Sequence, residues 1–215
     1  LAPLRNAIEI LKSVPAADPR GARAKELIER QARTLTRLVD DLLDTARISR
    51  GQVQLRREEL DLQPIVTRAV DTAREAIDSR GHELTLNLPP GRITVIGDAT
   101  RLEQVLGNLL HNAAKYTPDG GQLRVSLAQA ANGGPPEAVV SIEDTGIGIS
   151  AEMLPRVFDL FTQADHSLAH SQGGLGIGLS LVRSLIDLHG GRVVAKSEGL
   201  GKGSEFSVYL PLADG

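Results

Sequence analysis

Residues 104–116, which read QVLGNLLHNAAKY, decide the fold of this chain. Their apolar positions recur at helical spacing, and the pattern predicts a helix over residues 99–114. Asn108, Asn112 and Lys115 stand at i, i+4 and i+7, so all three project from one face of that helix. Asn is a poor helix former, whereas amide oxygens can ligate Mg²⁺ and an ammonium group can hold phosphate. By spacing alone, this face is either a binding site or an ordinary solvated surface.

A second segment, Asp144-Thr-Gly146-Ile-Gly148, comes directly after a predicted strand. An Asp at the end of a strand can accept a hydrogen bond from an exocyclic amine, and glycines let the backbone approach a flat base. Asp and Gly are also common in turns that only end a strand. The segment therefore indicates a base-binding pocket only in combination with other signals.

A third segment, GGLGIGL at residues 173–179, precedes a predicted helix over residues 179–188. Glycine backbone at a helix N-terminus suits a polyphosphate. No Gly-Lys-Ser/Thr comes after it, so the segment is not a P-loop. It does not match a dinucleotide-binding turn either, because neither a βαβ start nor an acidic residue for the ribose lies at the required distance.

The first 50 residues differ from the rest, because they contain one glycine and no strand-like run. Helical spacing is interrupted at residues 14–21, VPAADPRG, and resumes over residues 22–49 with a wide apolar stripe. Two such helices cannot bury that stripe between themselves, so we expect a dimer that completes a four-helix bundle. The alternative is a hairpin that packs on the rest of its own chain.

Residues 51–61 are polar and are predicted to be a linker. Beyond them, helix and strand patterns alternate, which predicts an α+β arrangement with helices on one face of a mixed sheet. The predicted elements are a helix over 62–79, strands over 83–88 and 93–96, the helix over 99–114, strands over 122–129 and 138–143, the helix over 179–188, and strands over 192–197 and 205–210.

Taken in order, these segments resemble the N, G1, F and G2 boxes of sensor histidine kinases. The boxes are Asn108-x-x-x-Asn112-x-x-Lys115-Tyr116, Asp144-x-Gly146-x-Gly148, Phe158-x-x-Phe161 and Gly174-x-Gly176-x-Gly178. Residues 37–44, RLVDDLLD, resemble the second helix of that family's dimerisation and phosphotransfer domain. The resemblance covers nearly the whole chain, and the combination is far more specific than any one box.

The resemblance implies three parts. Residues 1–50 would be a partial dimerisation and phosphotransfer domain, residues 51–61 a linker, and residues 62–215 an ATP-binding catalytic domain. That domain would be the two-layer α/β sandwich shared by histidine kinases, gyrase, MutL and the heat-shock chaperone ATPases. A mobile lid over ATP would occupy about residues 150–173.

The resemblance also implies a role for each residue of the boxes. Asn112 would be the principal Mg²⁺ ligand with Asn108 assisting, and Lys115 would contact the phosphates, so these three would be the catalytic residues. Tyr116 would lie against the nucleotide, and Asp144 would bind the adenine amine. Further nucleotide-binding positions are expected at the base pocket, the start of the lid and the phosphates: Gly146, Gly148, Phe158, Phe161, Gly174, Gly176, Gly178 and Leu179.

Position 108 separates kinases from hydrolases in this superfamily. The hydrolysing members carry Glu four residues before the metal-binding Asn, as the base for the attacking water. Asn108 cannot act as that base, so the resemblance implies that ATP is held for transfer. Phosphoryl transfer needs mainly positioning and neutralisation of charge by Mg²⁺.

The phosphoacceptor histidine of the family lies in a His-Glu-x-x-x-Pro box, and residues 1–6 resemble the segment directly after that box. We therefore expect the acceptor to precede Leu1, and residues 1–215 to bind Mg-ATP without phosphorylating themselves. None of the five histidines has that context: His82, His111, His166, His170 and His189.

The other histidine positions have alternative interpretations. His111 lies on the nucleotide helix and belongs either to the site or to the helix surface, whereas His189 reads as the end of a helix. His166 and His170 have metal-pair spacing but no neighbouring Glu of a zinc-protease motif. Similar kinases often carry Arg at both positions, so histidines there would make lid contacts sensitive to pH.

Composition excludes several other classes of protein. The chain has 215 residues, 41% hydrophobic and 24% charged, which suits one or two soluble domains. It has no cysteine, so a disulfide scaffold and thiol chemistry are excluded. A net charge of −3 and 2% aromatic residues argue against nucleic-acid binding. No run approaches the roughly 18 apolar residues of a membrane span, so we expect a cytoplasmic location without membrane contact from this segment.

The sequence thus predicts the ATP-binding part of a histidine kinase, with ATP and Mg²⁺ as cofactors. Its expected partners are a second copy, through residues 1–50, and the receiver domain of a response regulator. The parent protein could still be anchored in a membrane. Two other hypotheses stay open: a non-catalytic nucleotide-binding dimerisation module, and a conformational ATPase of the gyrase or MutL type.

Overall fold

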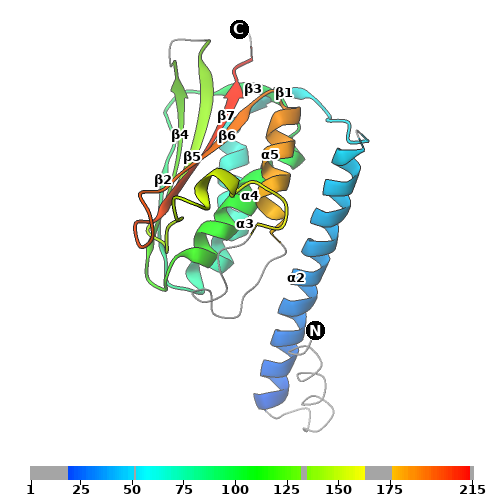
Figure 1. Ribbon diagram of the computed structural model, residues 1–215, viewed down its shortest axis with the longest axis vertical. Helices are drawn as coiled ribbons and strands as arrows, with labels where there is room; N and C mark the ends of the chain where they lie inside the picture. The colour runs from blue at the N-terminus through cyan, green and yellow to red at the C-terminus, as the bar shows by residue number, and fades with distance from the viewer. Residues whose placement is uncertain (1–18, 51, 132–134, 163–175, 214–215) are drawn as a thin grey trace. The chain divides into compact units, whose positions relative to one another are not determined.

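The computed structural model divides the chain into two compact units, Leu1–Arg50 and Gly51–Gly215 (Figure 1). It describes residues 19–50, 52–131, 135–162 and 176–213.

The first unit contains helix α2 (Pro19–Ser49), which is 31 residues long. It begins three residues earlier than predicted, with Pro19 as its first residue, where a helix needs no backbone N–H donor. Large apolar side chains along it stay 41–54% exposed, namely Leu35, Val39, Leu42 and Leu43. The first helix of the predicted hairpin lies outside the described residues. No described helix is long and apolar enough to cross a membrane.

The second unit is built on a five-stranded sheet with the order β2-β4-β5-β7-β6 (Figure 1). Strands β2 and β4 are parallel, and the other neighbours are antiparallel. The strands are β2 (Glu83–Asn87), β4 (Gln122–Ala130), β5 (Glu137–Asp144), β6 (Arg192–Lys196) and β7 (Ser204–Pro211).

Three helices cover one face of this sheet: α3 (Leu62–Asp78), α4 (Ala99–Tyr116) and α5 (Gly178–Leu188). Helix α4 packs against α3 on one side and α5 on the other. Helix α4 is therefore the middle helix of this layer. It continues two residues beyond the predicted end, so Lys115 and Tyr116 lie in its last turn.

Alternation along the strands separates the core from the outer face of the sheet. Leu123, Val125 and Leu127 of β4 are each at most 4% exposed, as are the inward side chains of β5. Arg124 and Glu143 alternate with these buried positions, on the outer face, and form an ion pair of 2.9 Å. Burial of one helical layer against one sheet face confirms the predicted α+β, two-layer architecture.

A small two-stranded sheet corrects the predicted linker. The last four residues of the expected linker form β1 (Glu58–Asp61), which pairs antiparallel with β3 (Thr94–Gly97). The polar sequence of β1 has little strand propensity of its own, and its conformation depends on the pairing with β3. Asp61 then caps α3 by accepting a hydrogen bond from the Gln63 backbone N–H at 3.1 Å.

Candidate functional site

Helix α4 is held at its N-terminus by a buried Asp–His pair. Asp98 is the N-cap, and its carboxylate accepts hydrogen bonds from the backbone N–H groups of Arg101 (3.2 Å) and Arg56 (3.0 Å). Its own N–H donates to Nε2 of His189 at 3.0 Å, while Nδ1 of His189 donates to the Leu185 carbonyl at 2.7 Å. His189 therefore carries its proton on Nδ1 and links the end of α5 to the start of α4.

Both members of this pair have shifted pKa values. Burial works to raise the pKa of Asp98, but hydrogen bonds from backbone N–H groups, first that of Arg56, outweigh it and hold the pKa below 3.8. Burial lowers the pKa of His189 below 6.5, and the bond to Leu185 opposes this only in part. The arrangement favours charged Asp98 beside neutral His189.

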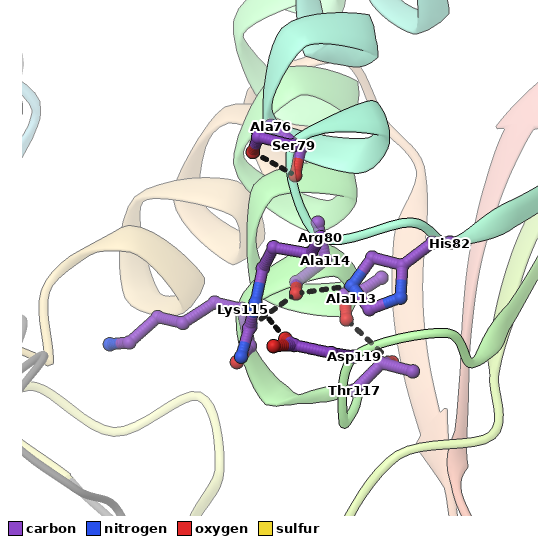
Figure 2. Close-up of polar contacts among 9 residues, drawn as sticks. All are labelled: Ala76, Ser79, Arg80, His82, Ala113, Ala114, Lys115, Thr117 and Asp119. Atoms are coloured by element: carbon purple, nitrogen blue, oxygen red, sulfur yellow. Dashed lines mark hydrogen bonds and ion pairs between the residues drawn. The ribbon is translucent and has the colours of Figure 1, made fainter.

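The C-terminus of α4 is held by the turn after α3 (Figure 2). Arg80 donates from Nη1 to the carbonyls of Ala114 (2.7 Å) and Lys115 (2.6 Å). His82 Nε2 also donates to the Ala114 carbonyl, at 3.0 Å. The last turn of α4 is thus fixed by side chains from another element.

One cavity collects residues from α4, β5, the segment after β5, the start of α5, and β7. Five residues named from the sequence line it together: Asn112, Tyr116, Asp144, Gly148 and Leu179. The other lining residues are Ala113, Ile147, Ile149, Met153, Val157, Thr162, Ser204 and Phe206. The wall is mostly apolar, and the few polar groups converge on one space, as is usual for a small-molecule site.

Asp144 is the one carboxylate among these lining residues. Its Oδ1 accepts from the Gly146 N–H at 2.8 Å, and its Oδ2 accepts from the Ser204 hydroxyl at 2.5 Å. Burial raises the pKa of Asp144 above 3.8, and the hydrogen bonds from Ser204 and Gly146 oppose that rise. The Ser204 hydroxyl was not recognised in the sequence, because only the pairing of β5 with β7 brings it to Asp144.

The two glycines after Asp144 are required by contacts within the protein. A Cβ atom on Gly146 would come 2.6 Å from the Tyr116 carbonyl oxygen, and one on Gly148 would come 2.0 Å from that of Gly199. Gly148 also has a φ of 69°, which favours glycine. Both glycines thus let backbone segments approach each other, and of the two Gly148 lines the cavity.

Asn108 and Lys115 lie beside the cavity and are not among its lining residues. The amide of Asn108 packs on the first residue of α5, since a Cβ on Gly178 would be 3.9 Å from its Cγ. Its Nδ2 atom is buried without a hydrogen-bond partner in the described part of the chain. Lys115 Nζ lies 3.1 Å from the Tyr116 hydroxyl and 4.6 Å from the centroid of that ring.

The start of the expected lid adjoins the cavity wall. Phe158 packs edge-on against Phe206, with ring centroids 6.2 Å apart, whereas Phe161 is 66% exposed and has a φ of 63°. The Phe161 N–H donates to the Gly176 carbonyl at 3.0 Å. The remainder of the expected lid, with His166 and His170, lies outside the described residues, as does Gly174.

Two further expectations concern the position of His111 and the binding of a metal ion. His111 lies on α4 and is not among the cavity-lining residues. Within the described ranges, no group of three or more His, Cys, Asp or Glu side chains could hold a metal ion.

Residues 97–214 match the family described as histidine kinase-, DNA gyrase B- and HSP90-like ATPases. The chain belongs to this family. The match includes every element that lines the cavity, namely α4, β5, the segment that comes after β5, the start of α5, and β7. The second unit is thus an ATP-binding catalytic domain of the kind found in sensor histidine kinases.

Individual relatives point the same way. The histidine protein kinase DivJ of Caulobacter vibrioides is 38% identical over 198 residues, covering 92% of this chain and 32% of DivJ. The histidine-protein kinase BaeS of Escherichia coli is 34% identical, covering 86% of this chain and 38% of BaeS. The chain therefore spans about a third of the length of these relatives. Among solved structures, the crystal structure of full-length ShkA in complex with AMPPNP superposes on this chain with a TM-score of 0.75. The two sequences are 27% identical, and the match covers 100% of this chain and 44% of ShkA.

Proposed function

We propose that this chain is the ATP-binding catalytic part of a sensor histidine kinase. The whole protein would move the γ-phosphoryl group of Mg-ATP to a histidine nitrogen, and then to an aspartate of a response-regulator receiver domain. The observation that carries the proposal is the single cavity in which Asn112, Tyr116, Asp144 and Leu179 meet. ShkA, a full-length structural relative, is in complex with the ATP analogue AMPPNP, which supports the same ligand here.

Asp144 would accept the exocyclic amine of adenine. A carboxylate offers about four lone-pair positions. Gly146 N–H and the Ser204 hydroxyl occupy two of these, which leaves room for a further donor. Tyr116 lines the same cavity and would lie against the nucleotide.

The phosphate end would lie toward α4 and the start of α5. Asn112 is the principal candidate ligand for Mg²⁺, and Asn108 is a second, because amide oxygens are hard donors and Mg²⁺ commonly completes its shell with phosphates and water. The amide nitrogen of Asn108 is buried without a hydrogen-bond partner in the described part of the chain, which leaves this amide available to a ligand. Bound Mg²⁺ would supply neutralisation of the phosphate charge during transfer.

Lys115 and the glycine segment would complete the phosphate site. The Lys115 ammonium would contact the phosphates as a point charge. Gly176 and Gly178, together with Gly174 outside the described residues, would let the backbone at the start of α5 approach them. The exposed Phe161 and the ring pair of Phe158 with Phe206 would mark the start of a lid over ATP.

Transfer is favoured over hydrolysis by the identity of residue 108. A hydrolase needs a base that activates water, and Asn108 has no basic group. The only carboxylate among the described lining residues, Asp144, is the one assigned to the adenine amine, so it is not the base that activates water. We infer that the acceptor histidine lies outside residues 1–215, since none of the five histidines is in a His-Glu-x-x-x-Pro box.

The proposed partners are a second copy of the chain and a receiver domain. Leu35, Val39, Leu42 and Leu43 form an exposed apolar stripe along α2, which supports a homodimer through residues 1–50. The receiver domain is proposed as a partner because of the resemblance to two-component kinases. Charged substitutions in the α2 stripe test the dimer.

Calorimetric titration with ATP in the presence and absence of Mg²⁺ tests the binding step. The unchanged chain should bind Mg-ATP, and Asn112→Ala should weaken binding by about tenfold or more, since ligand-shell changes cost roughly 10–100-fold. Glu103→Ala is the matched control, because Glu103 lies on the same helix and pairs with Arg68 away from the cavity. No binding by the unchanged chain would refute the proposal.

Labelled ATP tests the transfer step. Residues 1–215 should acquire no acid-labile phosphate, whereas the protein extended upstream through a His-Glu-x-x-x-Pro box should acquire it. Fast ATP turnover without an acceptor would support the conformational ATPase instead. Tight binding with no transfer in the extended protein would support a non-catalytic module.

A further inference from the structure

Arg80 connects the turn after α3 to three groups at the end of α4 (Figure 2). Its Nη1 donates to the carbonyls of Ala114 and Lys115, at 2.7 and 2.6 Å, and its Nε pairs with Asp119 at 2.9 Å. The Arg80 carbonyl accepts in return from the Gly120 N–H at 2.9 Å. None of the boxes that resemble histidine kinases includes this turn.

Two more side chains act on the same helix end. His82 Nε2 donates to the Ala114 carbonyl at 3.0 Å, and the Thr117 hydroxyl donates to the Ala113 carbonyl at 2.7 Å. The last carbonyls of a helix have no partner within it, and a cation is favoured at this negative end of the helix dipole. Arg80 meets both needs, and its bonds are charge-assisted and hence stronger than neutral ones.

The fixed turn is also the one that presents the site. Lys115, whose carbonyl Arg80 binds, directs its side chain away from Arg80, and Nζ lies 3.1 Å from the Tyr116 hydroxyl (Figure 2). On the opposite side, the Tyr116 carbonyl accepts from the Ile147 N–H at 3.0 Å, which ties the turn to the segment after Asp144. Asn112 lies one turn earlier on the same helix.

We propose that Arg80 is a positioning residue for ATP: it sets the last turn of α4 so that Asn112 and Lys115 meet the metal and the phosphates. The inference rests on the proposed nucleotide site. An arginine is required because a planar fork can reach two carbonyls and a carboxylate at once, whereas lysine offers one point charge. Asp144 is at the end of β5 and is held by Ser204 of the neighbouring strand β7, so adenine recognition depends on this turn less than the metal and phosphate contacts do.

The experiment compares Mg-ATP with adenosine as ligands. Arg80→Gln should weaken Mg-ATP binding on the order of tenfold, since small displacements of positioned groups cost up to about a hundredfold. Adenosine affinity, followed by NMR titration, should change by less than about twofold if Asp144 stays in place. Arg80→Lys should recover part of the Mg-ATP affinity, because it keeps the charge and one carbonyl contact.

Arg68→Gln is the matched control. Arg68 also joins α3 to α4, through its ion pair with Glu103 at 2.5 Å, but it touches no carbonyl of the helix end. It should change neither affinity. If Arg80→Gln does not fold, Arg80→Lys still tests the inference. It should lose Mg-ATP affinity to a smaller extent, with adenosine affinity unchanged.

Two results would overturn the inference. One is an equal loss of Mg-ATP and adenosine affinity in the Arg80 variants, which indicates a structural role only. The other is no change in Mg-ATP affinity. Failure of the unchanged chain to bind Mg-ATP would instead refute the proposed function, so the two failures are distinguishable.

Discussion

Asp144 shows at the scale of one residue how a partly buried acid is kept as an acceptor. Burial raises its pKa, and the donors from Ser204 and Gly146 oppose that rise by stabilising the charged form. The Gly146 N–H binds Oδ1 and the Ser204 hydroxyl binds Oδ2, so both oxygens are oriented. Because Asp144 lines the cavity, its charged form offers only hydrogen-bond acceptors there.

Asp144→Asn tests this arrangement. The amide would present a donor where an acceptor is needed, so Mg-ATP affinity should fall by about 10–100-fold, equivalent to the roughly 1.5–3 kcal/mol of a charged hydrogen bond. Calorimetric titration measures the change. Ser204→Ala is the control, because it keeps the carboxylate and removes one of its donors, and it should cost less. Equal affinity of Asp144→Asn and the unchanged chain would contradict the assignment of the adenine contact.

His189 carries a prediction on pH and stability. Its folded pKa is lowered below 6.5 by burial, with Asp98 opposing and Arg57 reinforcing the shift. Between the folded and unfolded pKa values the unfolded chain binds a proton that the folded chain does not, so stability is complete above pH 6.5 and is lost as pH falls toward the folded pKa. A tenfold difference in proton affinity between the folded and unfolded chains corresponds to about 1.4 kcal/mol of unfolding free energy.

Urea unfolding across this pH range, for the unchanged chain and for His189→Gln, measures the effect. The variant should be less stable at neutral pH and should have a flatter dependence of unfolding free energy on pH below about 6.5. The difference between the two curves removes the contributions of the other histidines. Parallel curves would show that His189 does not titrate with folding.

At the scale of elements, α4 is a helix whose two ends are fixed by other parts of the second unit. Asp98 and His189 hold the first turn, and Arg80 and His82 hold the last. The segment between β6 and β7 likewise fixes the backbone close to Asp144, because the Gly203 N–H donates to the Gly146 carbonyl at 3.1 Å. Site residues are thus placed by the junctions of elements, where the backbone segments touch.

Gly203→Ala tests one of these junctions. Gly203 has a φ of 69°, and an added Cβ would lie 1.9 Å from the Asp144 carbonyl oxygen. Gly120→Ala is the matched control, because its φ of 79° is similar and nothing lies within 4 Å of the added Cβ. The control should lose about 1–2 kcal/mol of unfolding free energy from the left-handed backbone. Gly203→Ala should lose roughly 1–3 kcal/mol more from the contact, together with nucleotide affinity. Similar losses of unfolding free energy for both variants would contradict the close approach of Gly203 to the Asp144 carbonyl oxygen.

At the scale of the whole molecule, the exposed apolar stripe of α2 predicts self-association. Val39 and Leu42 are 54% and 47% exposed, so their replacement by Glu should leave the second unit unaffected and convert a dimer to a monomer. Light scattering after size exclusion measures the mass. Arg47→Glu changes the net charge by the same amount from a neighbouring face of α2, and it should stay dimeric. A monomeric unchanged chain would refute the dimer proposal.

Much of the candidate site could be predicted from residues close together in sequence. Asn108, Asn112 and Lys115 share one helix, where spacing alone determines the shared face, and Asp144 comes at the end of its strand. The contacts of Arg80, His189 and Ser204 could not be predicted in this way. They join residues 34, 91 and 60 positions apart, and no local pattern specifies such pairs.

The order of the glycine and asparagine segments therefore predicted the kind of fold and, by resemblance, the family, and local periodicity predicted the helix that we propose binds the nucleotide. The tertiary structure decided what holds that helix, why Gly146 and Gly148 are glycines, and that the expected linker ends in the strand β1. The physical reason is the distance along the chain over which each kind of interaction acts. A helix or strand repeats its chemistry every few residues along the chain, but hydrogen bonds between elements exist only after the strands have paired and the helices have packed on the sheet.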